Sequence, residues 1–197
     1  MKNKEIFMKM ILVIVLLSGG YYFFIYNHND IQEYTTEELS IQHQFLTVNP
    51  YSRPGKALKR INGVVVHYTA NPGSSAQNNR DYFENLKTRH TTKVSSHFII
   101  GIDGEIIQCI PLNEIAYASN NRNNDTISIE CCHPDNSGQF TNATYKSLQK
   151  LIKNLMLTYS LNKNDIIRHY DVTGKECPKY FVKYPQKWEQ FKDSLDN

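Results

Sequence analysis

The sequence predicts an α/β (α+β) domain in which a central β-sheet is flanked by helices. Short apolar runs rich in β-branched residues, of which Val64-Val65-Val66 is the clearest, are typical of buried strands. They alternate along the chain with longer stretches whose apolar residues recur every three or four positions, as on one face of a helix. Elements that alternate in this way favour a sheet covered by helices.

Residues 1–27 are predicted to be an N-terminal signal-anchor. Three lysines in positions 2–9 precede an uncharged run from Met10 to Tyr26, which as a helix would be about 25 Å long at about 1.5 Å per residue. The lysines orient the N-terminus to the cytoplasm, and the closing aromatic residues suit a membrane interface. We therefore expect a single-pass transmembrane helix in the cell membrane, with the remaining chain outside the cytoplasm. The alternative is a signal peptide cleaved near Ser18-Gly19-Gly20 and a secreted domain.

Residues 28–43 are polar and lack a clear period, so we predict a tether there and place the domain at residues 44–197. Within the domain, strands are expected where apolar runs are bounded by turn residues. Asp103-Gly104 lies between two of these runs and is a strong hairpin signal. The expected strands are Ile61–Tyr68, Ser96–Ile102, Glu105–Ile110, Ile127–Cys132 and Ile166–Arg168.

Three helices are expected from the apolar periodicity. The first runs from Ser75 to about Thr88, the second from Thr141 to Ser160, and the third begins at Pro185, a residue that suits the first turn of a helix. The second has the most regular period. Trp188, Phe191 and Leu195 are expected to face inward from the last helix.

The composition excludes some functions. Lys and Arg number 22 against 19 Asp and Glu, and no basic stripe interleaved with aromatic residues is present, so no nucleic-acid partner is expected.

We expect a monomer. Thirteen tyrosines suit carbohydrate as well as a protein core. Of the four cysteines, Cys109 could pair with Cys131 or Cys132, or all could be buried free thiols.

One imidazole, one thiol and one amine lie within the stretch from Arg168 to Pro178, and a second imidazole ends the valine run about a hundred residues earlier. We hypothesise that His67, His169 and Cys177 hold one Zn²⁺ ion and that Lys175 points into the same site. Two imidazoles and a thiolate suit tetrahedral zinc, and three protein ligands leave one position for water. Copper or iron could take the same set. The alternative is a strand-end histidine, a loop histidine and a buried apolar cysteine.

Four motifs occur in one order: His67-Tyr68-Thr69, Ser95-Ser96-His97 with Asp103-Gly104 behind it, Ser128-Ile129-Glu130, and His169-Tyr170-Asp171 followed by Lys175-x-Cys177-Pro178. Together they resemble the type 2 N-acetylmuramoyl-L-alanine amidases, whose fold is shared with peptidoglycan recognition proteins. The resemblance covers about residues 45–185. It implies a mixed sheet with helices on both faces, a zinc ion at the floor of a surface groove, and a peptidoglycan (muropeptide) substrate. The bond cleaved would be the amide between N-acetylmuramic acid and the L-alanine of the stem peptide.

The resemblance also assigns roles. The zinc ligands fall on His67, His169 and Cys177, the acidic catalytic residue on Glu130, and the catalytic lysine on Lys175. A tyrosine that assists catalysis in some phage members falls on Ser96. A Trp-His pair that many relatives carry after the alanine matching Ala116 is Tyr117-Ala118 here, which changes the groove contacts.

Other residues are weaker candidates for the surroundings of the site. His97 is expected to support the site or the core rather than to contact the metal. Asp171 could orient a ligand imidazole or cap a loop. The asparagines at 120, 121, 123 and 124 could meet sugar or peptide, or could simply be solvated.

Two other functions fit parts of the pattern. Non-catalytic recognition modules keep the fold but lose a zinc ligand, typically the cysteine, whereas this chain keeps all three ligand positions and the lysine. A cysteine hydrolase would use Cys177 as nucleophile and His169 as base, but would leave His67 and Glu130 without a role.

Overall fold

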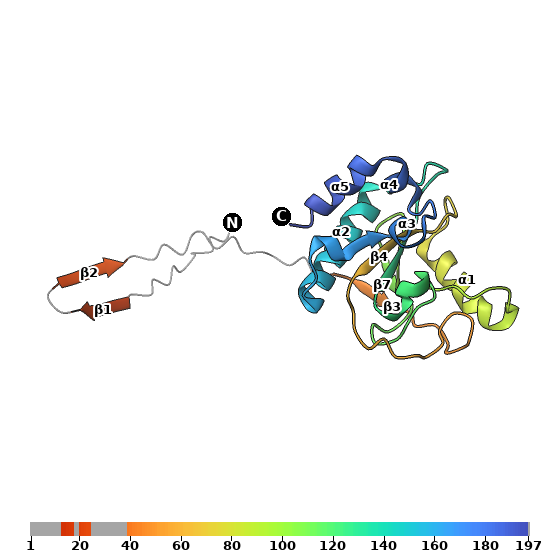
Figure 1. Ribbon diagram of the computed structural model, residues 1–197, viewed down its shortest axis with the longest axis horizontal. Helices are drawn as coiled ribbons and strands as arrows, with labels where there is room; N and C mark the ends of the chain where they lie inside the picture. Colours follow the sequence, from red (N-terminus) through yellow and green to blue (C-terminus); the bar gives the residue numbers. More distant parts are fainter. Residues whose placement is uncertain (1–12, 18–19, 25–38, 197) are drawn as a thin grey trace, which may run out of the picture. The chain divides into compact units, whose positions relative to one another are not determined.

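The computed structural model describes residues 13–17, 20–24 and 39–196. The chain divides into two compact units, Met1–Glu38 and Leu39–Asn197 (Figure 1). The second unit contains all the residues singled out above for a functional site.

The described part of the N-terminal unit consists of two strands. β1 (Val13–Leu17) pairs antiparallel with β2 (Gly20–Phe24). No helix in the described ranges has both the length and the apolar character needed to cross a bilayer. The prediction of a transmembrane signal-anchor over residues 1–27, and with it of a cell-membrane location, is therefore wrong. The same Val, Ile and aromatic residues that make this run apolar also favour strands, and consecutive glycines at 19 and 20 disfavour a helix.

The Leu39–Asn197 unit is built on a six-stranded sheet with the order β3-β6-β5-β7-β4-β8. β5, β7, β4 and β8 run parallel to one another, β6 is antiparallel to β5, and β3 is parallel to β6. The predicted mixed sheet and the predicted hairpin are thus confirmed. β3 consists of Ile41–His43, which we had predicted to be part of the tether. The strands are β3 (Ile41–His43), β4 (Val64–Tyr68), β5 (Phe98–Ile100), β6 (Ile106–Gln108), β7 (Ile127–Cys131) and β8 (Ile166–Arg168).

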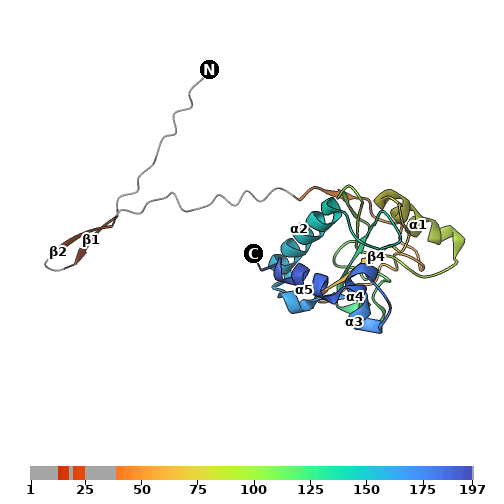
Figure 2. The same cartoon turned by 90° about the horizontal axis from the view of Figure 1, so that it is seen from above.

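Helices cover the sheet on both faces, with α1 (Ala76–Arg89) on one side and α2 (Asn142–Tyr159) and α5 (Pro185–Asp193) on the other (Figures 1 and 2). Alternate strand residues serve the two faces: Phe98 and Ile100 pack in the core with α2 and α5, whereas Ile99 packs in the core with α1. This alternation is the period of two that a strand imposes. Val64, Val65 and Val66 are all fully buried, as expected of a strand covered on both faces.

Local signals in the sequence define the long helices. Thr141 caps the N-terminus of α2, because its Oγ1 accepts a hydrogen bond from the Thr144 backbone N–H at 3.1 Å. Ser75 and Asn78 form a capping box at the start of α1. The short helices α3 (His169–Thr173) and α4 (Lys179–Lys183), and the 3₁₀ helices η2 (Asn120–Asn124) and η3 (Lys163–Asp165), were not predicted. They are too short to show a helical period.

Candidate metal centre

The three adjacent parallel strands β7, β4 and β8 deliver the first residues of the site. His67 on β4 lies opposite Glu130 on β7, and Val66 lies opposite Arg168, the last residue of β8. His169 follows Arg168 directly, so it lies level with His67. The carboxyl ends of parallel strands share one edge of the sheet, and here that edge brings together two imidazoles and a carboxyl that are distant in sequence.

Cys177 completes the group. The loop that carries it returns to the start of α3, where the Tyr170 N–H donates to the Cys177 carbonyl at 2.9 Å. One potential ligand atom from each of His67, His169 and Cys177 lies within 4.8 Å of the others, and all three residues are buried. The imidazole rings are 4.6 Å apart between centroids, and Cys177 Sγ is 3.8 Å from His67 Nδ1. The structure thus brings together the three residues predicted to bind metal.

Each imidazole is held through its Nε2 atom. His67 Nε2 is 3.1 Å from Ser119 Oγ, and His169 Nε2 is 3.0 Å from the amide oxygen of Asn120. An amide oxygen only accepts hydrogen bonds, so Asn120 holds the proton of His169 on Nε2. The Nδ1 atom of His169 is buried and has no hydrogen-bond partner.

The loop that carries Ser119 and Asn120 is itself braced. The side-chain oxygen of Asn123 accepts hydrogen bonds from the backbone N–H groups of Ala118 and Ser119, at 3.0 and 2.5 Å. Asn120 has a positive φ of 54°, a conformation that asparagine tolerates better than most residues. Sequence reasoning had considered these asparagines as substrate contacts or as solvated residues. It had overlooked Ser119, because nothing local links positions 119–123 to His67 or His169.

These features fit a zinc ion. In tetrahedral zinc sites the Zn–N bond is about 2.1 Å long and the Zn–S bond about 2.3 Å. A nitrogen and a sulfur ligand of one ion are therefore roughly 3.6 Å apart. The 3.8 Å between His67 Nδ1 and Cys177 Sγ is close to that spacing. The buried, unpartnered Nδ1 of His169 supplies a free lone pair, and metal-bound histidines commonly donate their other N–H to a polar neighbour.

Glu130 is half-buried beside this group, and its Oε2 atom is buried without a hydrogen-bond partner. Burial raises the pKa of the Glu130 carboxyl to about 8, and the positive charge of Lys175 opposes this shift. A carboxyl group with no protein partner is free to exchange a proton with a ligand or with water.

Lys175 has an exposed side chain, yet its charge reaches the site. Burial first, and then the charge of Lys175, lowers the pKa of His169. Burial raises the pKa of the Cys177 thiol to about 12, helped by the charge of Glu130 and opposed by a backbone hydrogen bond from Tyr68 and by Lys175. The pKa of His67 is lowered by burial, by the charge of His169 and by that of Lys175. Lys175 is therefore near enough to influence all three candidate ligands electrostatically.

His97 and Ser96 form part of the sheet interior rather than the metal group. His97 Nδ1 accepts a hydrogen bond from the Ser128 N–H at 3.0 Å, which leaves Nε2–H to donate to the Glu114 carbonyl at 2.9 Å. Burial lowers the pKa of His97 to about 4, with the Glu114 contacts opposing. Ser96 Oγ donates to the Ser128 carbonyl at 2.9 Å. Both side chains tie the residues directly before β5 to β7.

Asp171 and Tyr117 also have local partners. Asp171 accepts hydrogen bonds from the Arg168 N–H at 2.8 Å and from the Arg168 guanidinium at 2.7 Å, so it caps α3. Of the two roles considered for Asp171, this contact supports capping. Tyr117 and Ser95 are joined through their backbones, because the Ser95 N–H donates to the Tyr117 carbonyl at 3.0 Å.

All four cysteines are buried free thiols.

A mixed sheet with helices on both faces and a His-His-Cys group at the carboxyl edge of its strands defines the class of protein. Residues 57–180 match the N-acetylmuramoyl-L-alanine amidase family, and the chain belongs to this family. It is 34% identical over 171 residues to N-acetylmuramoyl-L-alanine amidase CwlL of Bacillus licheniformis, covering 81% of this chain and 47% of that protein. It is also 34% identical over 174 residues to N-acetylmuramoyl-L-alanine amidase BlyA of Bacillus subtilis, covering 78% and 46%.

Solved structures agree with this assignment. The catalytic domain of XlyA superposes with a TM-score of 0.66 at 31% identity, covering 79% of this chain and 99% of that domain. A mutant endolysin from Bacillus subtilis superposes with a TM-score of 0.67 at 32% identity, covering 80% and 99%. The chain spans about half the length of the curated relatives it matches.

Proposed function

We propose that the protein is a zinc-dependent N-acetylmuramoyl-L-alanine amidase, which hydrolyses the amide bond between N-acetylmuramic acid and the L-alanine of the peptidoglycan stem peptide. The observation that carries the proposal is the convergence of His67, His169 and Cys177 within 4.8 Å, in a chain of the amidase family, with Glu130 directly opposite His67 in the sheet. The two relatives named above are called by this activity.

In this proposal His67 and His169 would hold the ion through Nδ1, and Cys177 would hold it as a thiolate. A zinc ion held there would lower the pKa of water and polarise the substrate carbonyl. Glu130 accepts the proton of the attacking water and returns it to the leaving nitrogen of L-alanine, and its unpartnered Oε2 is available for that exchange. Lys175 stabilises the negative charge that develops on the carbonyl oxygen in the transition state.

The first test compares the full chain with Cys177→Ser. We expect about one zinc per chain in the parent protein, and release of new N-terminal L-alanine from purified peptidoglycan. Both should be lost in Cys177→Ser, because serine is a poor zinc ligand. Cys132→Ser is the matched control, since it alters another buried cysteine outside the metal group and should keep both properties. A parent protein that binds muropeptide without zinc and without turnover would instead be a recognition module.

A second pair of variants separates metal binding from catalysis. Glu130→Gln and Lys175→Met should keep zinc but lower kcat, by roughly 10²- to 10⁴-fold for the glutamate and roughly 10²- to 10³-fold for the lysine. Zinc content and kcat, measured on the same preparations, show whether each variant keeps the metal while losing catalysis. Full activity in Glu130→Gln would contradict the proton-transfer role.

A further inference from the structure

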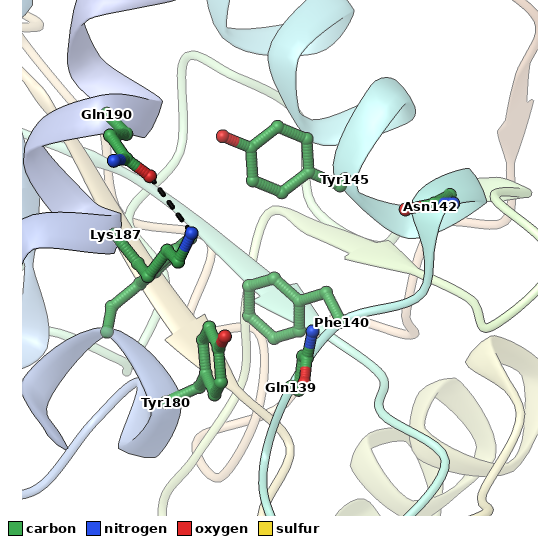
Figure 3. Close-up of a pocket in the computed structure, with 8 residues that line it drawn as sticks. Gln139, Phe140, Asn142, Tyr145, Tyr180, Lys187 and Gln190 are labelled. Atoms are coloured by element: carbon green, nitrogen blue, oxygen red, sulfur yellow. Dashed lines mark hydrogen bonds between the residues drawn. The ribbon is translucent and has the colours of Figure 1, made fainter. Parts of the chain in front are cut away.

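The described residues also form a cavity whose lining includes none of the three candidate metal ligands. It encloses about 240 Å³ between the N-terminus of α2, α4 and α5 (Figure 3). Aromatic rings from α2, α4 and the segment before α2 face a shared space, and amide groups and one lysine border it. The lining residues are Gln139, Phe140, Asn142, Tyr145, Tyr180, Phe181, Lys187 and Gln190.

Chain connectivity places this cavity close to the metal ligands. Tyr180 is three residues after Cys177, and three peptide links of about 3.8 Å keep their Cα atoms within about 11 Å of each other. On the other wall, Gln139 follows Gly138, which is buried against the ring of Tyr68: a Cβ built on Gly138 would lie 3.4 Å from that ring. Tyr68 directly follows His67. Each wall is thus linked to the candidate metal centre within a few residues, one wall through Cys177 and the other through Tyr68.

The lining chemistry suits a sugar ring. Aromatic faces pack against the C–H groups of a pyranose, and amide and ammonium groups hydrogen-bond to hydroxyl and acetamido groups. Lys187 Nζ donates to Gln190 Oε1 at 3.1 Å (Figure 3), which leaves the Gln190 NH₂ group and the remaining Lys187 protons free for a ligand. Both of these side chains are exposed, so they can meet a ligand that enters from solvent.

The size of the cavity indicates what fraction of a ligand it takes. Its volume of about 240 Å³ lies just below the range of about 300–1,000 Å³ typical of sites that hold a whole small ligand. One ring of a longer polymer, anchored elsewhere, suits this volume better than a separate ligand.

We propose that this cavity is a glycan subsite, which binds an N-acetylated sugar ring of the substrate strand other than the sugar that carries the scissile amide. The proposal rests on the proposed amidase function for the identity of the polymer. It assigns Gln190 and Lys187 to hydrogen bonding and Tyr180 to stacking. Longer glycan strands would then bind more tightly than a single muramyl peptide.

The binding test uses a probe with no peptide and no cleavable amide, the tetramer of N-acetylglucosamine, titrated into the zinc-loaded full chain. We expect the probe to perturb residues that line the cavity in NMR spectra. Gln190→Ala and Lys187→Ala should each weaken its Kd by about three- to tenfold, the effect of losing one or two hydrogen bonds. Gln186→Ala is the matched control, because Gln186 is exposed on the same helix but does not line the cavity. An unchanged Kd in both cavity variants would overturn the proposal.

The kinetic test compares a substrate that has one sugar with one that has several. Gln190→Ala should raise KM about three- to tenfold for the longer substrate and leave kcat and KM for the single-sugar muramyl peptide unchanged. Equal losses on both substrates would show that the cavity takes a part common to both, the peptide or the muramyl sugar, and would also overturn the proposal. If the parent chain shows no amidase turnover but binds the tetramer in a Gln190-dependent way, the amidase function fails and the subsite stands.

Discussion

Ser119 and Asn120 contact the two histidines of the candidate metal centre. Each contacts the Nε2 atom of one imidazole, at 3.1 and 3.0 Å, and so directs the other nitrogen of the ring toward the candidate site. Two adjacent residues of one loop therefore orient both histidines, of which His67 lies on β4 and His169 begins α3. A substitution in this loop would change the geometry of the proposed ligands without removing any of them.

We expect Asn120→Ala to weaken zinc binding by about 10- to 100-fold, the usual cost of losing such a partner of a metal-bound histidine. Competition with a chromophoric chelator measures this directly, and the visible spectrum of the Co²⁺-substituted protein reports a change in ligand geometry. Asn121→Ala is the control, because Asn121 is exposed in the same loop and should leave both measurements unchanged. Equal zinc affinity in the two variants would rule out a positioning role for Asn120.

At the scale of elements, the start of α2 connects a helix to the hairpin beside it. Thr141 Oγ1 caps the helix by accepting from the Thr144 N–H at 3.1 Å and donates to the Ile102 carbonyl at 2.6 Å. Thr144 Oγ1 adds a bond to the Gly101 carbonyl at 2.8 Å. These contacts fix the end of α2 that borders the cavity described above.

Thr141→Ala should lower the free energy of unfolding by about 1–2 kcal/mol, because the cap and the bond to Ile102 are lost together. Urea denaturation followed by circular dichroism measures this change. Thr158→Ala provides the comparison, since Thr158 lies near the other end of α2 and bonds only within the helix, to the Asn154 carbonyl at 2.8 Å. A Thr141→Ala loss no larger than that of Thr158→Ala would contradict the capping argument.

At the scale of the whole domain, Glu84 ties α1 to the segment that leads into the sheet. Its carboxylate accepts from the Thr47 N–H at 3.0 Å and from Thr47 Oγ1 at 2.6 Å, and it pairs with Lys87. Burial acts to raise the pKa of Glu84, but the bonds from Lys87 and Thr47 outweigh it and lower the pKa from 4.5 to about 2.

This lowered pKa predicts an acid dependence of stability. The unfolded chain binds the proton more readily than the folded one, so the Glu84 contribution is complete above pH 4.5 and is lost as the pH falls toward about 2. Glu84→Gln should therefore be less stable than the parent at pH 7 and should lose less stability between pH 5 and pH 3. Urea denaturation at each pH tests this, with the exposed Glu189→Gln as control. Parallel stability–pH curves for parent and Glu84→Gln would contradict it.

Much of the fold could be predicted because its signals are local. The period of α2, the Asp103-Gly104 turn and the valine run of β4 are contained within single elements, and the structure has each of them where the pattern indicated. The run at positions 10–26 was misinterpreted because its signal is hydrophobicity alone, which does not separate a helix from strands. The described residues there form β1 and β2.

The sequence by itself determined which side chains are able to form the site: two histidines at strand ends, a cysteine before a proline, and a glutamate in an apolar strand. Only the tertiary structure decided which atoms meet. The pairing of β4 with β7 and β8 sets His67 opposite Glu130 and level with His169, and the loop at 119–123 supplies the partners of both imidazoles. Strand order and loop placement depend on packing between residues 50 to 110 positions apart, and no local pattern in a single sequence records those contacts.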